Sequence, residues 1–191
     1  MSRGIRNQNP LNIRRSADRW DGARKEQTDP SFVQFESMAY GYRAAWKVLE
    51  SYWKHFKRER QPFTVSSVIS RWAPPGENDT DNYVRTVLKL TSLGGQEHLP
   101  RPFAGIAIDK LVRLLAAMTT MECGIPYKQV DTKAIWEGYE LAFPGKLGEK
   151  VPEGKDIGSP VAETPVRVEL PYVADDCREL DEYWDWSPLS S

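Results

Sequence analysis

Apolar residues recur at helical spacing in the middle of the first hundred residues, and this pattern restricts the fold more than any other feature. The positions that follow the i, i+3, i+4, i+7 rule are Ala45, Val48, Leu49, Tyr52, Trp53 and Phe56. The pattern predicts an amphipathic helix that begins near Ser37 or Ala39 and ends by Arg60, because Pro62 cannot continue it. Such a helix must bury its single apolar stripe against other elements, so the chain must pack several helices together.

Four further helices are predicted from the same kind of periodicity. The first carries Val65, Val68, Ile69 and Trp72 behind a Thr64 N-cap, and the second, capped by Asp79 or Thr80, carries Tyr83, Val84, Val87 and Leu88. The third runs from about Ile106 to Met121 and stops near Gly124, and the last begins at Thr132 and ends at Pro144-Gly145. Their stripes are typical of a core and not of a cofactor site.

Residues 1–35 show little helical periodicity and contain many Asn, Asp, Gly and Pro residues, so we expect turns and short extended pieces there. Phe32-Val33-Gln34-Phe35 has the pattern of a short strand. The predicted fold class is therefore mainly α, a lysozyme-like helical domain with a short β-hairpin or strand near the N-terminus.

Composition changes beyond Lys146, where Gly, Pro, Glu and Asp dominate and periodicity disappears. We expect a helical domain over residues 1–145 and a flexible acidic tail over residues 146–191. Residues 1–60 carry 13 Lys and Arg against 7 acids, whereas residues 146–191 carry 5 against 11. The basic first part either meets an acidic polymer, such as nucleic acid or an anionic cell wall, or is simply a solvated face.

Several classes of protein are disfavoured by simple features. No apolar run is long enough for a membrane span, and no apolar stretch follows the basic residues at the N-terminus, so we expect no signal peptide and synthesis in the cytoplasm. The two cysteines, Cys123 and Cys177, have no metal-like spacing. No phosphate loop, dinucleotide fingerprint or zinc motif is present, so neither a metal nor a cofactor is expected.

An asparagine-rich segment opens the chain: residues 3–14 read RGIRNQNPLNIR. Asparagine side chains bond nearby backbone and tolerate the left-handed conformation, which suits a tight loop. The same amides can hold sugar hydroxyls or N-acetyl groups, so both a structural and a binding role are open.

This segment resembles the RGIRNNNPxNIR opening of a family found in phages and prophages and often described as virion structural proteins. Three further pieces resemble that family in order: Trp20-Asp21-Gly22, the segment FVQFESMAYGYRA at residues 32–44, and the segment ISRWAPPGENDTDNYV at residues 69–84. The resemblance covers residues 3–90, and several motifs in order are more specific than one.

The layout is also similar to that of wall-cleaving glucosaminidases, which share the lysozyme-like fold. That resemblance implies binding, and cleavage, of peptidoglycan glycan strands. In those enzymes the general-acid glutamate ends a helix upstream of the asparagine segment, but here no acid precedes Asn7. The remaining candidates for the catalytic carboxyl are Glu36, beside Phe35 and Met38, and Glu77. Each also has a structural interpretation, as a helix-start residue or a partner of Arg71.

The resemblance implies a sugar groove with polar anchors and flat walls. The candidate substrate-binding residues are Asn9, Asn12, Trp20, Tyr40, Arg43, Trp72, Asn78 and Tyr83. Arg43 is a candidate partner of Glu36, and the aromatic residues are equally compatible with a core.

Two functions follow from these observations. The first is a phage-type protein that binds peptidoglycan glycan strands and cleaves them as a lysozyme or lytic transglycosylase. The second is a catalytically inactive virion structural or binding protein on the same fold, with other virion proteins as partners. Either protein would be found in the virion or delivered to the cell wall. Nucleic acid is the weakest candidate partner, because the basic residues are scattered and no helix-turn-helix signature is present.

Overall fold

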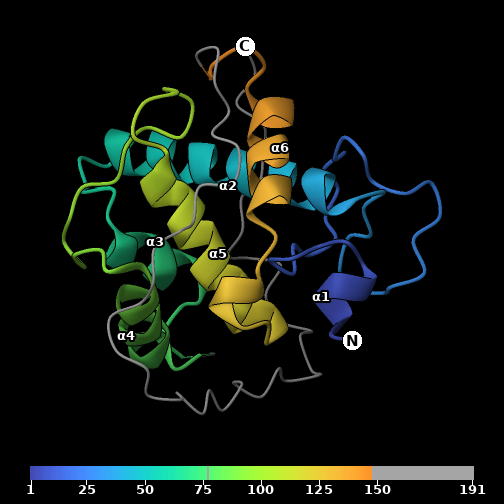
Figure 1. Ribbon diagram of the computed structural model, residues 1–191, viewed down its shortest axis with the longest axis horizontal. Coiled ribbons are helices and arrows are strands. Elements are labelled where there is room, and N and C mark those ends of the chain that lie inside the picture. Colours follow the sequence, from blue (N-terminus) through green and yellow to red (C-terminus); the bar gives the residue numbers. More distant parts are fainter. Residues whose placement is uncertain (77, 148–191) are drawn as a thin grey trace.

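The computed structural model describes residues 1–76 and 78–147 and confirms a mainly helical chain (Figure 1). The α-helices are α1 (Arg3–Arg6), α2 (Met38–Arg58), α3 (Val65–Trp72), α4 (Thr80–Thr91), α5 (Asp109–Cys123) and α6 (Thr132–Ala142), with a short 3-10 helix at Tyr127–Gln129. The predicted boundary at residue 145 stays a prediction, because most of the predicted tail lies outside the described residues.

The long helix α2 runs across the molecule, and α5 and α6 lie over it in Figure 1. The axes of α2 and α6 come close because Gly138 on α6 has no side chain: a Cβ there would lie 2.7 Å from the Cβ of Tyr42 and 2.8 Å from the carbonyl oxygen of Ala39. Beside this contact, the fully buried Trp46 packs edge-on against Tyr139 at 5.0 Å between ring centroids. Its indole N–H donates to the Ile135 carbonyl at 3.0 Å. The predicted apolar stripe of α2 therefore finds its partner in α6.

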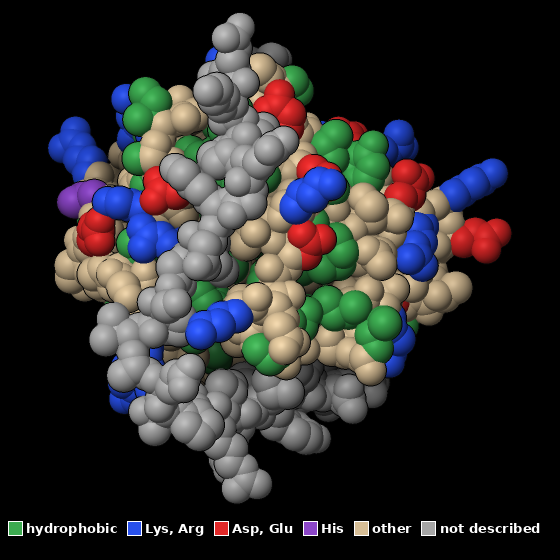
Figure 2. Space-filling model, in the orientation of Figure 1, with side chains coloured by type: hydrophobic (Ala, Val, Ile, Leu, Met, Phe, Trp, Pro, Cys, Tyr) green, Lys and Arg blue, Asp and Glu red, His purple; other side chains and the backbone are tan. Residues whose placement is uncertain are grey.

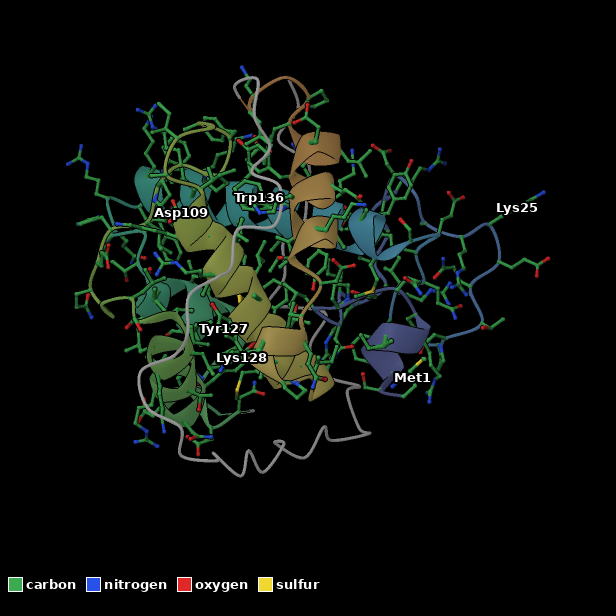
Figure 3. The ribbon with its side chains drawn as sticks, in the orientation of Figure 1. Met1, Lys25, Asp109, Tyr127, Lys128 and Trp136 are labelled. Carbon is green, nitrogen blue, oxygen red and sulfur yellow. The ribbon has the colours of Figure 1, made fainter. Side chains whose placement is uncertain are left out.

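Two helix starts are fixed by the caps that the sequence predicted. The Thr64 hydroxyl accepts from the N–H of Ser67 in a capping box, and the Asp79 carboxylate accepts from the N–H of Asn82 at the start of α4. The carboxylate of Asp131, which was not predicted as a cap, accepts from the N–H of Ala134 at the start of α6. At the other end, Gly124 terminates α5 with φ +67°, a left-handed conformation that glycine adopts without strain. The helix α5 begins at Asp109, three residues after the predicted start. Figure 3 marks that start, and Tyr127 in the turn beyond its other end.

One hydrophobic cluster joins both parts of the described chain. It extends from Leu11 and Phe35 in the N-terminal segment to Phe143 after α6. Trp53, which the periodicity placed in the α2 stripe, is only half-buried and packs edge-on against Phe103 at 5.1 Å between centroids. It lies at the border of the core, as one of the partly buried residues that pack against it.

The N-terminal segment differs from the sequence-based expectation in two ways. Residues 3–6 form the short helix α1, and the strand predicted at residues 32–35 is not formed as a ladder: Phe32 and Phe35 make only isolated antiparallel bridges, to Arg14 and Ala23. Neighbouring side chains take the place of a partner strand. The N–H of Gln34, for example, donates to Oε1 of Gln27 at 2.7 Å.

None of the helices in the described ranges is long and apolar enough to cross a bilayer. On the face shown in Figure 2, basic and acidic side chains are intermixed over the helices.

Candidate functional site

A glutamate at the end of α5, Glu122, accepts hydrogen bonds from side chains of three other segments. Oε2 of Glu122 accepts a hydrogen bond from Nδ2 of Asn12 at 3.1 Å. Oε1 accepts two, from the indole Nε1 of Trp72 and from the hydroxyl of Tyr83, each at 3.1 Å. The N-terminal loop, α3, α4 and α5 therefore meet at one carboxyl group, and these four residues are called the Glu122 cluster below.

The local backbone brings Asn12 against the end of α5. Asn12 has φ +49°, a left-handed conformation that asparagine tolerates better than most residues. Gly4 of α1 allows the close approach, because a Cβ there would lie 2.7 Å from Sγ of Cys123 and 3.0 Å from Oδ1 of Asn12. The start of the chain thus packs on the last turn of α5, more than a hundred residues away.

Burial raises the pKa of Glu122 above its ordinary value, which favours the neutral acid. The hydrogen bonds from Asn12, Tyr83 and Trp72 and the positive charge of Arg14 oppose this effect without cancelling it. The residue as a whole is half-buried, so the carboxyl is enclosed by protein while part of Glu122 still reaches the surface. A carboxyl in this setting keeps its proton to a higher pH than an exposed glutamate does.

The hydrogen bonds also decide which oxygen carries that proton. Trp72 can only donate, and burial together with the nearby Glu122 raises the pKa of Tyr83, so its hydroxyl stays protonated. With both donors on Oε1, the acidic proton belongs on Oε2. Next to it, Oδ1 of Asn12 is buried and has no hydrogen-bond partner in the described part of the chain. The Oε2 side of the cluster therefore holds one protonated carboxyl oxygen, which also accepts from Nδ2 of Asn12, beside one buried amide oxygen without a donor.

The cluster suits proton transfer better than nucleophilic or metal chemistry. Burial raises the pKa of the adjacent Cys123 to about 11, so its thiol is protonated at neutral pH and not a ready nucleophile. Over residues 1–76 and 78–147, no three His, Cys, Asp or Glu residues gather in a way that suits a metal ion.

Comparison with known proteins gives a relative from a bacterial virus. The chain is 32% identical over 148 residues to Protein P5 of Pseudoalteromonas phage PM2, an alignment that spans 75% of this chain and 84% of that protein. The chain belongs to the family of phage PM2 Protein P5. No family model matches the chain.

In this member of the P5 family, the structure unites three of the residues that the sequence singled out. Asn12, Trp72 and Tyr83 come from three separate motifs, and all donate to Glu122. Asn9 lies close by in the chain but is fully buried, and its amide is used internally by the backbone of Ile13 and Val33. Asn78 is half-buried in the turn before α4, where it forms a backbone bridge with Pro75.

The other predicted site residues lie elsewhere. Glu36 is exposed, and among the described residues no hydrogen bond joins it to the Glu122 cluster. The expected pairing of Arg43 with Glu36 is wrong, because Arg43 forms its ion pair with Asp21. Tyr40 packs on Gly22, and Trp20 lines a separate groove. Glu77 lies outside the described residues.

Sequence reasoning missed Glu122, although a signal for it existed. The last turn of α5 is otherwise buried, from Thr119 to Met121 and again at Cys123, so a glutamate there is unusual in a stripe of core residues. The resemblance to glucosaminidases implies a glutamate at the end of a helix that lies beside the asparagine segment. The structure has that arrangement, but the helix comes after the asparagine segment in the chain and not before it.

Proposed function

We propose that this member of the P5 family is a virion-associated protein that binds the glycan strands of peptidoglycan and cleaves them, with Glu122 as the general acid. The observation that carries the proposal is the enclosed carboxyl of Glu122, held by Asn12, Trp72 and Tyr83. The sequence resemblance to wall-cleaving enzymes of lysozyme-like fold points to the same substrate.

Cleavage of a glycosidic bond needs a protonated carboxyl beside the leaving oxygen. Burial keeps the proton on Glu122, and the two donors on Oε1 direct that proton to Oε2. In the proposed step, Oε2 gives its proton to the glycosidic oxygen while the bond from that oxygen to the anomeric carbon breaks. The anomeric carbon is then captured by water or by a hydroxyl of the same sugar. The proton lost by that oxygen passes to solvent, and the Glu122 carboxylate takes up a proton from solvent to restore the acid.

The residues around Oε2 suit a sugar ligand. Trp72 and Asn12 are half-buried, so each keeps some surface for contact, and Asn12 has a buried amide oxygen without a donor. Carbohydrate sites combine flat apolar walls with a few polar anchors of this kind.

A second function is a virion protein that binds glycan without cleaving it. The observation in its favour is that no second carboxyl group takes part in the Glu122 cluster among the described residues, whereas many glycosidases use two. In that case the surface around Asn12 and Trp72 would anchor the virion to the wall.

The deciding experiment compares two matched variants on purified peptidoglycan. Glu122→Gln should lower the rate of product release by about 10²–10⁴, because an amide keeps the shape but delivers no proton. Glu36→Gln, a change of the same kind at an exposed position, should leave the rate unaltered. Loss of activity in Glu36→Gln alone would assign the acid to Glu36. Binding by the wild type without product release would establish the second function.

Unfolding experiments separate this effect from damage to the fold. The amide oxygen of a glutamine can still accept from Trp72 and Tyr83, so Glu122→Gln should remain folded. Because the pKa of Glu122 is raised in the folded protein, its contribution to stability is full at low pH and is lost as the pH rises through that pKa. The variant has no such group and should therefore match or exceed the wild type in melting temperature at neutral pH.

A further inference from the structure

A groove in the N-terminal segment gathers positive charge. It has a volume of about 720 Å³, and its walls come from residues 15–27 and Val33. Four cationic side chains line it, Arg15, Arg19, Arg24 and Lys25, against the single acid Asp18. Lys25 lies at the tip of the loop and points away from the helices (Figure 3). These four cations are called the basic strip below.

The charges of the basic strip are not neutralised by acids. Within residues 1–76 and 78–147, none of the four forms an ion pair. Two are instead oriented by backbone: Arg15 donates to the Asp29 carbonyl at 3.2 Å and Arg24 to the Phe35 carbonyl at 2.8 Å. Asp18 accepts from the Ser16 hydroxyl at 2.8 Å. Cations on the helices behave differently, since Lys54 pairs with Glu50 and Lys110 with Glu97.

The basic strip lies close in the chain to the Glu122 cluster. Asn12 holds Oε2 of Glu122, and Arg15, three residues later, lines the groove. Three residues span at most about 10 Å of chain, so one extended polymer is long enough to contact both the cluster and the near end of the strip.

We propose that the basic strip binds the carboxylate groups of the peptide stems of peptidoglycan, so that the preferred ligand is a glycan strand that still carries its peptides. This inference rests on the proposed function. In the intact strand the lactyl carboxyl groups of the sugars are bound as amides to the peptides, so the negative charge of the polymer lies on its peptide stems. Peptide stems carry free carboxylates, which arginine and lysine bind directly.

A single-stranded nucleic acid is the other anionic polymer to consider. Proteins that hold such strands usually combine cations with several aromatic side chains on which bases stack. The groove has one aromatic residue, Trp20, so successive bases would have no series of rings to stack on there. This feature favours the peptide-bearing glycan.

The test measures binding of the full chain carrying Glu122→Gln, which removes cleavage, to two forms of insoluble peptidoglycan. One form is intact, and in the other the carboxylates have been converted to neutral amides with a carbodiimide and methylamine. The double change Arg19→Ala with Lys25→Ala removes two exposed cations that make no hydrogen bond in the described part of the chain. The matched control is Arg85→Ala with Lys89→Ala, two exposed cations on α4.

Affinity for intact peptidoglycan should fall about three- to tenfold in the Arg19 and Lys25 variant, since each exposed charge contact contributes modestly. The affinity of the variant for the amidated form, and the affinity of the α4 control for both forms, should not change. Added salt should weaken binding of the intact form only.

Three results would overturn the inference. They are equal affinity for intact and amidated peptidoglycan, an equal loss on both forms in the variant, and competition by a single-stranded oligonucleotide that is stronger than that of intact peptidoglycan and is lost in the variant. Failure of the cleavage proposal is a different result. If the wild type never releases product but prefers intact over amidated peptidoglycan through Arg19 and Lys25, the cleavage proposal fails and the basic strip stands.

Discussion

The N-terminal segment, residues 7–36, and the helices α2 to α6 are held together by different forces. In the N-terminal segment the buried residues include the polar Asn7, Asn9 and Gln34, and their side chains take the place of secondary structure. In the helices the fully buried side chains are mainly large and apolar, as Trp46 and Leu115 are. In Figure 1 the N-terminal segment, in blue, lies to one side of the helices and leads into the start of α2.

This difference shows which of the two regions fixes the geometry of the Glu122 cluster. Apolar packing is non-directional, so the helical core supplies stability and a platform for Trp72, Tyr83 and Glu122. Hydrogen bonds are directional, and a network of them holds the loop that delivers Asn12. The predictions below test this division, from the largest expected effect to the smallest.

Trp46→Ala should cause the largest loss of stability, about 3–5 kcal/mol, because it empties a fully buried site between α2 and α6. Trp53→Ala, on the same helix but half-buried, should cost clearly less. Urea unfolding followed by circular dichroism measures both. Equal losses would show that the border of the core around Phe103 is as important as its centre.

Asn9→Ala should cost about 2–3 kcal/mol, because it leaves the buried N–H of Ile13 and the carbonyl of Val33 without the Asn9 amide, while the Ile13 carbonyl keeps the N–H of Val33. Asn82→Ala, a half-buried position on α4, is the control and should change stability by about 0.5 kcal/mol or less. Hydrogen exchange should show increased opening at residues 9–13 in Asn9→Ala. An unchanged urea midpoint would mean that the loop is held by packing and not by this network.

Asp29→Asn should cost about 1–2 kcal/mol at neutral pH and little in strong acid. The two hydrogen bonds from Arg3, each 2.7 Å long, hold the pKa of Asp29 well below its ordinary value, with help from Asn7 and two backbone N–H groups. A depressed pKa means that the contribution to stability is present above the ordinary value near 3.8 and is lost as the pH falls below it.

Thermal melts of the wild type and the Asp29→Asn variant over a range of pH should therefore converge at low pH. A constant difference between the two curves down to strong acid would show that the ionised pair with Arg3 does not stabilise the N-terminal segment.

Much of the helical part could be predicted from sequence, since α2, α3, α4 and α6 follow local periodicity and the caps Thr64 and Asp79 are local signals. The short helix α1 was not predicted, because four residues are too few to show a helical period of apolar positions. At the candidate site, Asn12, Trp72 and Tyr83 were identified through motifs, whereas Glu122 was not. Outside that site, the ion pair of Arg43 with Asp21 was not predicted either.

The sequence by itself determined the helices, their ends and the concentration of positive charge near the N-terminus, because these depend on neighbours a few residues apart. Only the tertiary structure decided which carboxyl group meets the asparagine loop. Asn12 and Glu122 are 110 positions apart, and they meet because Gly4 lets α1 pack on the last turn of α5. The proton affinity of Glu122 is likewise a tertiary property, since it depends on burial and on donors from three other segments.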